Sequence, residues 1–142
     1  MMLEFAANWN ESDFYPFEIV ENEKLVVDWK PIIISIINDL RNNTSASIIS
    51  AKFHNTLAEI ILETAKKSGT KKVVLSGGCF QNALLTERTI ELLQKNDCKV
   101  YWHQRVPPND GGVSLGQIAA YLILYNNSTM IEKKNLLKKD IE

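Results

Sequence analysis

A chain of 142 residues is long enough for one domain with a hydrophobic core, but short for two. Hydrophobic residues make up 45% and charged residues 23%, and a formal net charge of −1 gives no general attraction to nucleic acid or to an anionic membrane. The apolar runs 31–37 and 118–125 are too short to span a bilayer, and the first residues lack the basic start of a secretory signal. We therefore expect no nucleic-acid partner, no membrane and, with two cysteines that lack metal-type spacing (Cys79 and Cys98), a cytoplasmic location.

The first part of the chain predicts a hairpin between two helices. Residues 2–9 favour a short helix, and residues 14–20 and 25–29 favour two strands joined by a polar turn. Pro31 suits the first turn of the next helix, where its missing N–H costs nothing, and apolar residues keep helical spacing to about Arg41.

The middle of the chain predicts a long helix followed by a buried strand. The helix covers about residues 45–67, and its apolar stripe recurs at intervals of three and four: Ile49, Phe53, Leu57, Ile60 and Ile61. Gly69 is placed to close this helix. Residues 73–75 are a continuous apolar run, which is typical of a strand covered on both faces.

The last part of the chain continues the alternation of helix and strand. Residues 80–95 favour a helix, residues 99–103 a strand and residues 113–126 a helix with one apolar side. Residues 128–142 form a charged tail, expected as a loosely attached helix or a disordered segment, after a single folded region over residues 1–127. The order predicts an α/β fold with parallel strand–helix–strand units and right-handed crossovers, in which the N-terminal hairpin extends a mixed sheet.

The first candidate site is the glycine-rich corner that follows the strand at residues 73–75. Ser76, Gly77 and Gly78 join this strand to the next helix, so backbone N–H groups and the positive helix end could hold a phosphate. Asn82, one turn further on, could reach a ribose or a base. The alternative is that the two glycines only form a tight turn, and no P-loop pattern is present.

Cys79 lies at the start of the same helix, where a thiolate would be stabilised. A nucleophilic role is conceivable, but no histidine lies nearby in the sequence to act as its base. A small buried cysteine without a chemical role is the alternative.

The second candidate site is the acidic corner 109–112, with the sequence Asn-Asp-Gly-Gly, which two prolines precede. Asp110 is either the N-cap of the last helix or a ligand that binds a metal together with histidines from elsewhere. Both corners follow strands of a predicted parallel sheet, where ligands bind at the carboxyl edge, so we expect both to act on one ligand.

The two histidines have no metal-type spacing in the sequence. His54 lies in the middle of the long helix, where a lone histidine is more often structural or surface-exposed than a ligand. His103 ends a strand and could face the cleft between the corners.

Three segments together make the sequence recognisable: AKFHNTLA (51–58), LSGGCFQN (75–82) and VPPNDGGVSLGQ (106–117). In this order and at these separations they resemble the C-terminal lobe of the TsaD-like carbamoyltransferase domain of HypF, the hydrogenase-maturation carbamoyltransferase family. The resemblance covers roughly residues 14–121. It implies an actin-like fold (the sugar kinase and Hsp70 type), in which two similar lobes hold a nucleotide between them and this chain forms the second.

The resemblance also implies roles for individual residues. The Ser-Gly-Gly turn would contact phosphate, with Asn82 holding the nucleoside and His54 a weaker candidate on the same side of the cleft. Asp110 would bind a divalent metal, zinc or iron, that is shared with two histidines of a first lobe. The implied ligands are ATP or AMP, or carbamoyl adenylate.

The implied activity is transfer of a carbamoyl group from carbamoyl adenylate to the C-terminal cysteine thiol of a HypE-like acceptor, on the route to the cyanide ligands of [NiFe] hydrogenase. The remaining HypF domains, or a separate chain that supplies them, would be needed, and we expect the chain to be inactive alone. An exposed lobe face would favour a homodimer. The alternatives are a non-catalytic module that binds nucleotide or docks a partner, and a thiol enzyme centred on Cys79.

Overall fold

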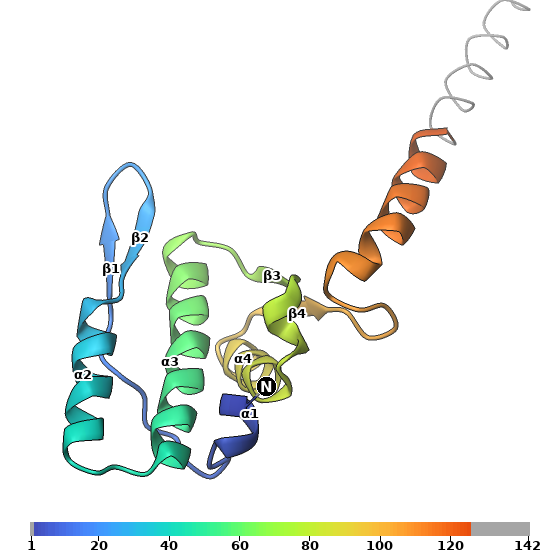
Figure 1. The fold of residues 1–142 in the computed structure, drawn as a ribbon. Coiled ribbons are helices and arrows are strands. Elements are labelled where there is room, and N and C mark those ends of the chain that lie inside the picture. Colours follow the sequence, from blue (N-terminus) through green and yellow to red (C-terminus); the bar gives the residue numbers. More distant parts are fainter. Residues whose placement is uncertain (1, 126–142) are drawn as a thin grey trace, which may run out of the picture.

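A computed structural model describes residues 2–125, which form an α/β arrangement of helices beside two small sheets (Figure 1). Its elements in chain order are α1 (Met2–Ala6), β1 (Glu18–Glu21), β2 (Leu25–Asp28), α2 (Lys30–Arg41), α3 (Ala46–Lys67), β3 (Lys72–Leu75), the 3-10 turn η1 (Gly78–Gln81), α4 (Ala83–Lys95), β4 (Lys99–Trp102) and the 3-10 turn η2 (Asp110–Gly112). Residues 113–125 form a further helix. The order and class agree with the predicted fold, and the lysine-rich segment 128–142 lies outside the described residues.

The hairpin and the parallel pair form as predicted, but they belong to different sheets. Strands β1 and β2 are antiparallel, β3 and β4 are parallel, and each pair is a separate two-stranded sheet. The prediction that the hairpin extends the parallel sheet is therefore wrong. Part of the reason lies at the outer edge of β3, where the Thr70 hydroxyl donates to the Lys72 carbonyl at 3.2 Å and accepts from the Lys72 N–H at 3.3 Å, so this residue's main-chain groups are already bonded locally.

Helix α3 is central, and it is buried more widely than its predicted apolar stripe suggests (Figure 1). It contributes Ile60 to a cluster with Tyr15 and Ile32, and Leu62 to a second cluster that also contains residues of β3, α4 and β4. Because elements pack on both sides of α3, polar residues share its buried surface. Four of its polar side chains are buried: Ser50, His54, Asn55 and Thr56.

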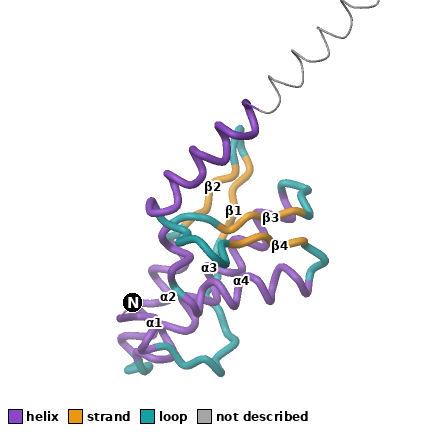
Figure 2. The backbone as a smooth tube through the Cα atoms, turned by 90° about the vertical axis from the view of Figure 1, so that its right-hand side faces the viewer, coloured by secondary structure: helices purple, strands orange, loops and turns teal. Residues whose placement is uncertain are grey.

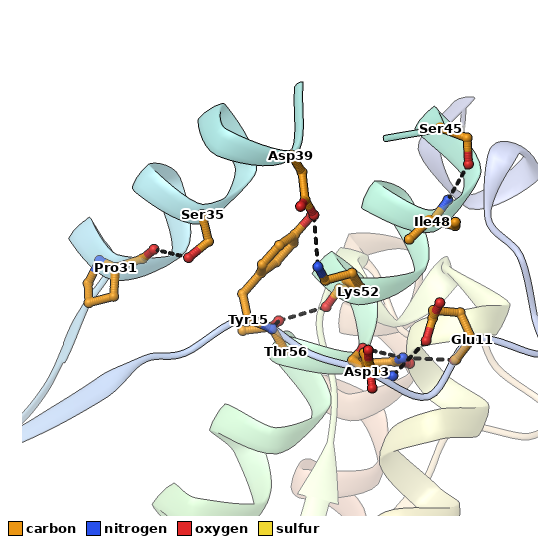
Figure 3. Close-up of polar contacts among 11 residues, drawn as sticks. Glu11, Asp13, Tyr15, Pro31, Ser35, Asp39, Ser45, Ile48, Lys52 and Thr56 are labelled. Carbon is orange, nitrogen blue, oxygen red and sulfur yellow. Dashed lines mark hydrogen bonds and ion pairs between the residues drawn. The ribbon is translucent and has the colours of Figure 1, made fainter. Parts of the chain in front are cut away.

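The buried polar groups of α3 have partners. The Thr56 hydroxyl donates to the Lys52 carbonyl at 2.6 Å and accepts from the Tyr15 N–H at 2.8 Å (Figure 3). The Tyr15 hydroxyl donates to the Asp39 carboxylate at 2.8 Å, which also receives the Lys52 ammonium at 2.8 Å. Burial, followed by the bond to Asp39, raises the pKa of Tyr15. These contacts fix the segment before β1 against α3 and α2.

The parallel sheet is covered on one face only, so the prediction that β3 is buried on both faces is wrong. Leu75 and Val100 point into the core formed with α3 and α4, whereas Val74 is 70% exposed. Side chains alternate along a strand, and no described element packs over the Val74 side. Figure 2 shows the pair with α4 along one side.

The helix at residues 113–125 begins where it was predicted, but it projects away from the other described elements (Figures 1 and 2). Its predicted apolar side is exposed, including Leu115, Ile118 and Leu122. No helix among residues 2–125 is both long and apolar enough to cross a membrane.

Candidate functional site

The two glycine-rich corners contact each other at the carboxyl edge of the β3–β4 pair. The Gly77 N–H donates to the Pro108 carbonyl at 2.7 Å. The Ser76 hydroxyl lies 3.1 Å from Nε2 of His103, the residue that follows β4. The prediction that both corners share one edge is therefore confirmed, and His103 joins them there.

The main-chain amides of the first corner are not all available to a ligand. The Gly77 N–H donates to the second corner, so the prediction that the backbone N–H groups of this turn hold a phosphate is wrong for Gly77. Among the described residues, the amides of Gly78 and Cys79 have no acceptor. Gly77 has φ +101°, a conformation that side-chain-bearing residues rarely adopt, so glycine is needed for this turn.

Helix α4 begins later than predicted. The 3-10 turn η1 follows the glycines, and Asn82 is the N-cap of α4 rather than a residue one turn inside a helix. Its Oδ1 accepts from the Leu85 N–H at 2.9 Å, and the Ala83 N–H donates to the Glu4 carboxylate at 2.6 Å. The free donors at this corner therefore belong to the turn before α4, while these two N–H groups of the helix are occupied.

His54 and Asn82, predicted as separate candidates, lie in direct contact. Nδ1 of His54 is 2.7 Å from the Ser50 carbonyl, and Nε2 is 2.8 Å from the amide nitrogen of Asn82. A carbonyl can only accept, so Nδ1 carries the proton and Nε2 accepts from the amide. The imidazole is 3% exposed and neutral in this arrangement, with both nitrogens paired.

The contacts of Asn82 restrict what it can offer a ligand. One hydrogen of its amide goes to His54, and its oxygen already accepts from Leu85. An amide nitrogen has two hydrogens, so one donor remains. Asn82 is thus best suited to contact an acceptor, such as a hydroxyl or carbonyl oxygen.

A pocket of about 500 Å³ lies beside this pair. Its wall combines the first corner, the His54–Asn82 pair, other residues of α3 and helix α1: Leu3, Glu4, Phe53, His54, Leu57, Gly78, Cys79, Gln81, Asn82 and Leu85. Most of the exposed lining is apolar, with a few polar side chains from α1, α3 and the corner, which is the usual composition of a small-molecule site. Cys79 is an exposed free thiol on this wall.

Asp110 was predicted as either the N-cap of the last helix or a metal ligand, and the N-cap interpretation is wrong. The side chain of Asn109 accepts from the Gly111 N–H at 3.0 Å and caps η2 instead. Asp110 is exposed and does not cap the turn, so its carboxylate could bind a cation. Residues 2–125 contain no group of three histidine, cysteine or acidic side chains that could hold a metal. The described residues thus offer one ligand and do not by themselves fit a complete metal centre.

Glu4 is the residue of this region that sequence reasoning missed. It is 9% exposed although it lies on a five-residue helix, and its carboxylate contacts the start of α4, 79 residues along the chain. Its only sequence signal is an acidic residue within a short apolar segment, which does not reveal a partner so distant in sequence.

Comparison with known proteins identifies the family to which this chain belongs. A family model described as "Carbamoyltransferase, Kae1-like Domain, second subdomain" matches residues 1–117. The chain belongs to this family of carbamoyltransferase subdomains.

Curated relatives agree with this assignment. The chain is 41% identical over 109 residues to "Carbamoyltransferase HypF" of Synechocystis sp., an alignment that covers 76% of this chain and 14% of that protein. It is 34% identical over 88 residues to "tRNA N6-adenosine threonylcarbamoyltransferase" of Endomicrobium trichonymphae, covering 59% of this chain and 25% of that protein. The chain therefore spans a small part of the curated relatives it matches.

Solved structures of similar proteins have the same fold. A crystal structure of "full-length HypF in the phosphate- and nucleotide-bound form" matches with a TM-score of 0.75 and 40% identity, covering 81% of this chain and 16% of that one. A crystal structure of T. kodakarensis HypF matches with a TM-score of 0.61 and 26% identity, covering 87% of this chain and 16% of that one. The HypF resemblance predicted from the three sequence segments is confirmed.

Proposed function

We propose that this chain forms one wall of a carbamoyl-adenylate site in a HypF-type carbamoyltransferase. The single observation that carries the proposal is the contact between the two corners, in which the Gly77 amide binds the Pro108 carbonyl. That bond brings the free amides of Gly78 and Cys79 to the same edge as Asp110. In this proposal the amides bind the phosphate, the pocket takes the nucleoside, and Asp110 binds a cation, all on the same carbamoyl adenylate.

The first corner would bind phosphate through main-chain amides. The Gly78 and Cys79 amides have no acceptor among residues 2–125, and an added Cβ at Gly78 would meet no described atom within 4 Å, so the approach to this corner is open. Asn82 would donate its remaining N–H to a ribose hydroxyl, with His54 holding its amide in place. The similar full-length HypF was crystallised in a phosphate- and nucleotide-bound form, which supports ATP, AMP or carbamoyl adenylate as the ligand.

The proposed reaction is acyl transfer to sulfur. The thiol of a C-terminal cysteine on a HypE-like acceptor attacks the carbamoyl carbon, a C–S bond forms, and the bond from that carbon to the phosphate oxygen breaks. AMP leaves with the electron pair, and the thiol proton passes to a base or to water. In this chain the residues named above would bind and orient the adenylate, and none of them is assigned as the base.

A divalent metal, zinc or iron, would supply Lewis-acid stabilisation of the transferring group if Asp110 shares it with ligands from a first subdomain. One carboxylate leaves most coordination positions to water, so we propose weak metal binding by this chain alone. The remaining HypF domains, or a chain that supplies them, are proposed partners for the same reason.

Saturation-transfer NMR with AMP on the wild type, Gly78→Ala and Gly78→Asp tests the proposal. Both substitutions place a Cβ in open space at a position without positive φ, so both should fold. Aspartate adds a negative charge beside the phosphate donors, and alanine does not. We expect the AMP signal to persist in the alanine variant and to disappear in the aspartate variant; equal signals in all three proteins would refute the phosphate site.

A non-catalytic docking module is the second candidate, and the exposed apolar helix at residues 113–125 favours it. The same experiment separates the two functions. No AMP signal from the wild type, even with a first subdomain added, would support the docking module and exclude the carbamoyl-adenylate site.

A further inference from the structure

Helix α1, α3 and the start of α4 are joined by a closed circuit of hydrogen bonds. On one side the Ser50 hydroxyl donates to the Leu3 carbonyl, and Nδ1 of His54 donates to the Ser50 carbonyl at 2.7 Å. Asn82 donates to His54 at 2.8 Å and caps α4. The Ala83 N–H then donates to the carboxylate of Glu4, the residue next to Leu3, at 2.6 Å.

Each member of this circuit restrains the next. Asn82 can donate to His54 and accept from Leu85 at the same time only if its side chain keeps one rotamer and α4 begins at Ala83. The Glu4 carboxylate fixes that beginning, because it holds the first N–H of the helix through a charge-assisted bond. With that bond removed, the first turn of α4 can fray, and the cap contact of Asn82 weakens with it.

Burial makes the circuit stiff. Glu4 is 9% exposed, and the Ser50 and His54 side chains are almost fully covered. Water therefore replaces a lost partner poorly, and an unpaired donor or acceptor here is costly. A five-residue helix such as α1 is too short to be stable alone, so its contacts with α3 and α4 hold it in place.

We propose that Glu4 is a positioning residue that holds Asn82 and His54 in the orientation needed to contact the ligand. Helix α1 carries Glu4 and ties α3 to the start of α4, and we call this helix the clamp. This inference rests on the proposed nucleotide site, because Asn82 is the residue that would contact the ligand. Leu3 and Glu4 also line the pocket beside Asn82, so α1 forms part of the same wall. Loss of the clamp would loosen the pocket without removing any group that touches the ligand's phosphate.

Four variants of the full chain test the inference: Glu4→Ala, Glu4→Asp, Glu4→Gln and, as a matched control, Glu63→Ala. Alanine removes the acceptor, aspartate keeps the charge but is one methylene shorter, and glutamine keeps the reach and an acceptor oxygen. Glu63 is a half-exposed acid on α3 whose ion pair with Lys66 is outside the circuit. The readouts are amide hydrogen exchange at Ala83, the ¹⁵N resonances of the His54 ring, and AMP binding by saturation-transfer NMR.

In the wild type and in the control we expect a single Nδ1–H tautomer of His54 and a protected Ala83 amide. In the alanine and aspartate variants, exchange at Ala83 should accelerate about 10- to 100-fold, since a charge-assisted hydrogen bond is lost. The Nε2 resonance of His54 should shift as its donor is released. The glutamine variant keeps an acceptor oxygen at the same reach but forms a neutral hydrogen bond, so exchange at Ala83 should accelerate less, and the His54 resonance should shift less, than in the alanine and aspartate variants.

Wild-type exchange and an unchanged His54 spectrum in the alanine variant would overturn the inference, as would a glutamine variant that exchanges as fast at Ala83 as the alanine variant. The AMP readout separates this outcome from failure of the proposed function. If the wild type binds no AMP even with a first subdomain added, while Ala83 and His54 respond as expected, the nucleotide site is refuted and the clamp stands. If AMP binds equally to all variants, positioning by Glu4 is refuted and the nucleotide site stands.

Discussion

Replacement of Asn82 by alanine should destabilise the fold through two separate losses. The side chain caps α4 by accepting from the Leu85 N–H, and loss of such a cap costs about 1 kcal/mol. It also donates to Nε2 of His54, which is buried and would be left without a donor, at a cost of about 1–3 kcal/mol. We expect the free energy of unfolding to fall by about 2–4 kcal/mol, the sum of these two losses.

Asn82→Asp divides this total into its parts. A carboxylate oxygen can still accept from the Leu85 N–H, so the cap survives, but aspartate has no donor for Nε2 of His54. With the cap kept, the aspartate variant should lose only the His54 contact, and its unfolding free energy should lie between those of the wild type and the alanine variant near neutral pH. Thr86, another polar residue at the start of α4, offers a control: its hydroxyl bonds only to carbonyls that precede it, and Thr86→Ala should cost less than Asn82→Ala.

Urea unfolding followed by far-UV circular dichroism is the assay, with the midpoints compared at a common m-value. If the unfolding free energy of Asn82→Ala lies within about 0.5 kcal/mol of the wild-type value, neither bond stabilises the protein and the His54–Asn82 pair is not a structural unit. If the alanine and aspartate variants are equally destabilised, the whole effect comes from His54 and the cap contributes nothing.

Three further predictions concern other parts of the chain. The bond from Lys52 is the main cause that lowers the pKa of Asp39 in the folded protein. The stability from this ion pair should therefore be present above the ordinary carboxyl pKa and lost as pH falls through the lower folded pKa. In acid titrations followed by circular dichroism, the stability of Asp39→Asn should converge on that of the wild type at low pH, and a stability difference that persists there would contradict the prediction. Gly77→Ala should cost about 1–3 kcal/mol from backbone strain alone, because its Cβ would meet nothing within 4 Å, and a neutral result in urea unfolding would place that φ in doubt. The exposed apolar helix 113–125 should make the chain self-associate as its concentration rises, and Ile118→Lys should reduce this self-association. Sedimentation velocity measures both, and a wild type that stays monomeric at all concentrations would exclude self-association through this helix.

Local patterns in the sequence predicted the elements well because each pattern reports on its own neighbourhood. Pro31 lies in the first turn of α2, and Gly69 has the positive φ of a helix-closing glycine. The parallel pairing of β3 and β4 also followed from a short strand–helix–strand unit.

Burial was predicted less well because it depends on what packs against each element. The apolar run at 73–75 indicated a strand covered on both faces, yet Val74 is exposed because only one face of the β3–β4 pair is covered. The stripe of α3 indicated one buried side, whereas packing on two sides of this helix also buries polar residues such as His54 and Thr56.

The candidate site was predicted residue by residue, but its connections were not. Ser76, Gly77 and Asn82 were each selected from a motif, and no pattern indicated that the Gly77 amide would bind the second corner or that Asn82 would bind His54. Such contacts join residues far apart in the chain, and periodicity carries no information at that range. Glu4 is the extreme case, with its partner Ala83 79 residues away.

The same contacts bear on how the site would work as a unit. The Gly77–Pro108 bond makes the phosphate corner and the acidic corner parts of one structure, so a shift of either corner moves the other. The helix at residues 113–125 begins directly after the acidic corner, and its exposed apolar side chains are available to a partner. A parallel sheet is normally covered on both faces, and no element among residues 2–125 covers the Val74 side of this one. A partner that covers these apolar surfaces would therefore also restrain the acidic corner, and through Gly77 the phosphate corner, so we expect partner binding and nucleotide binding to strengthen each other.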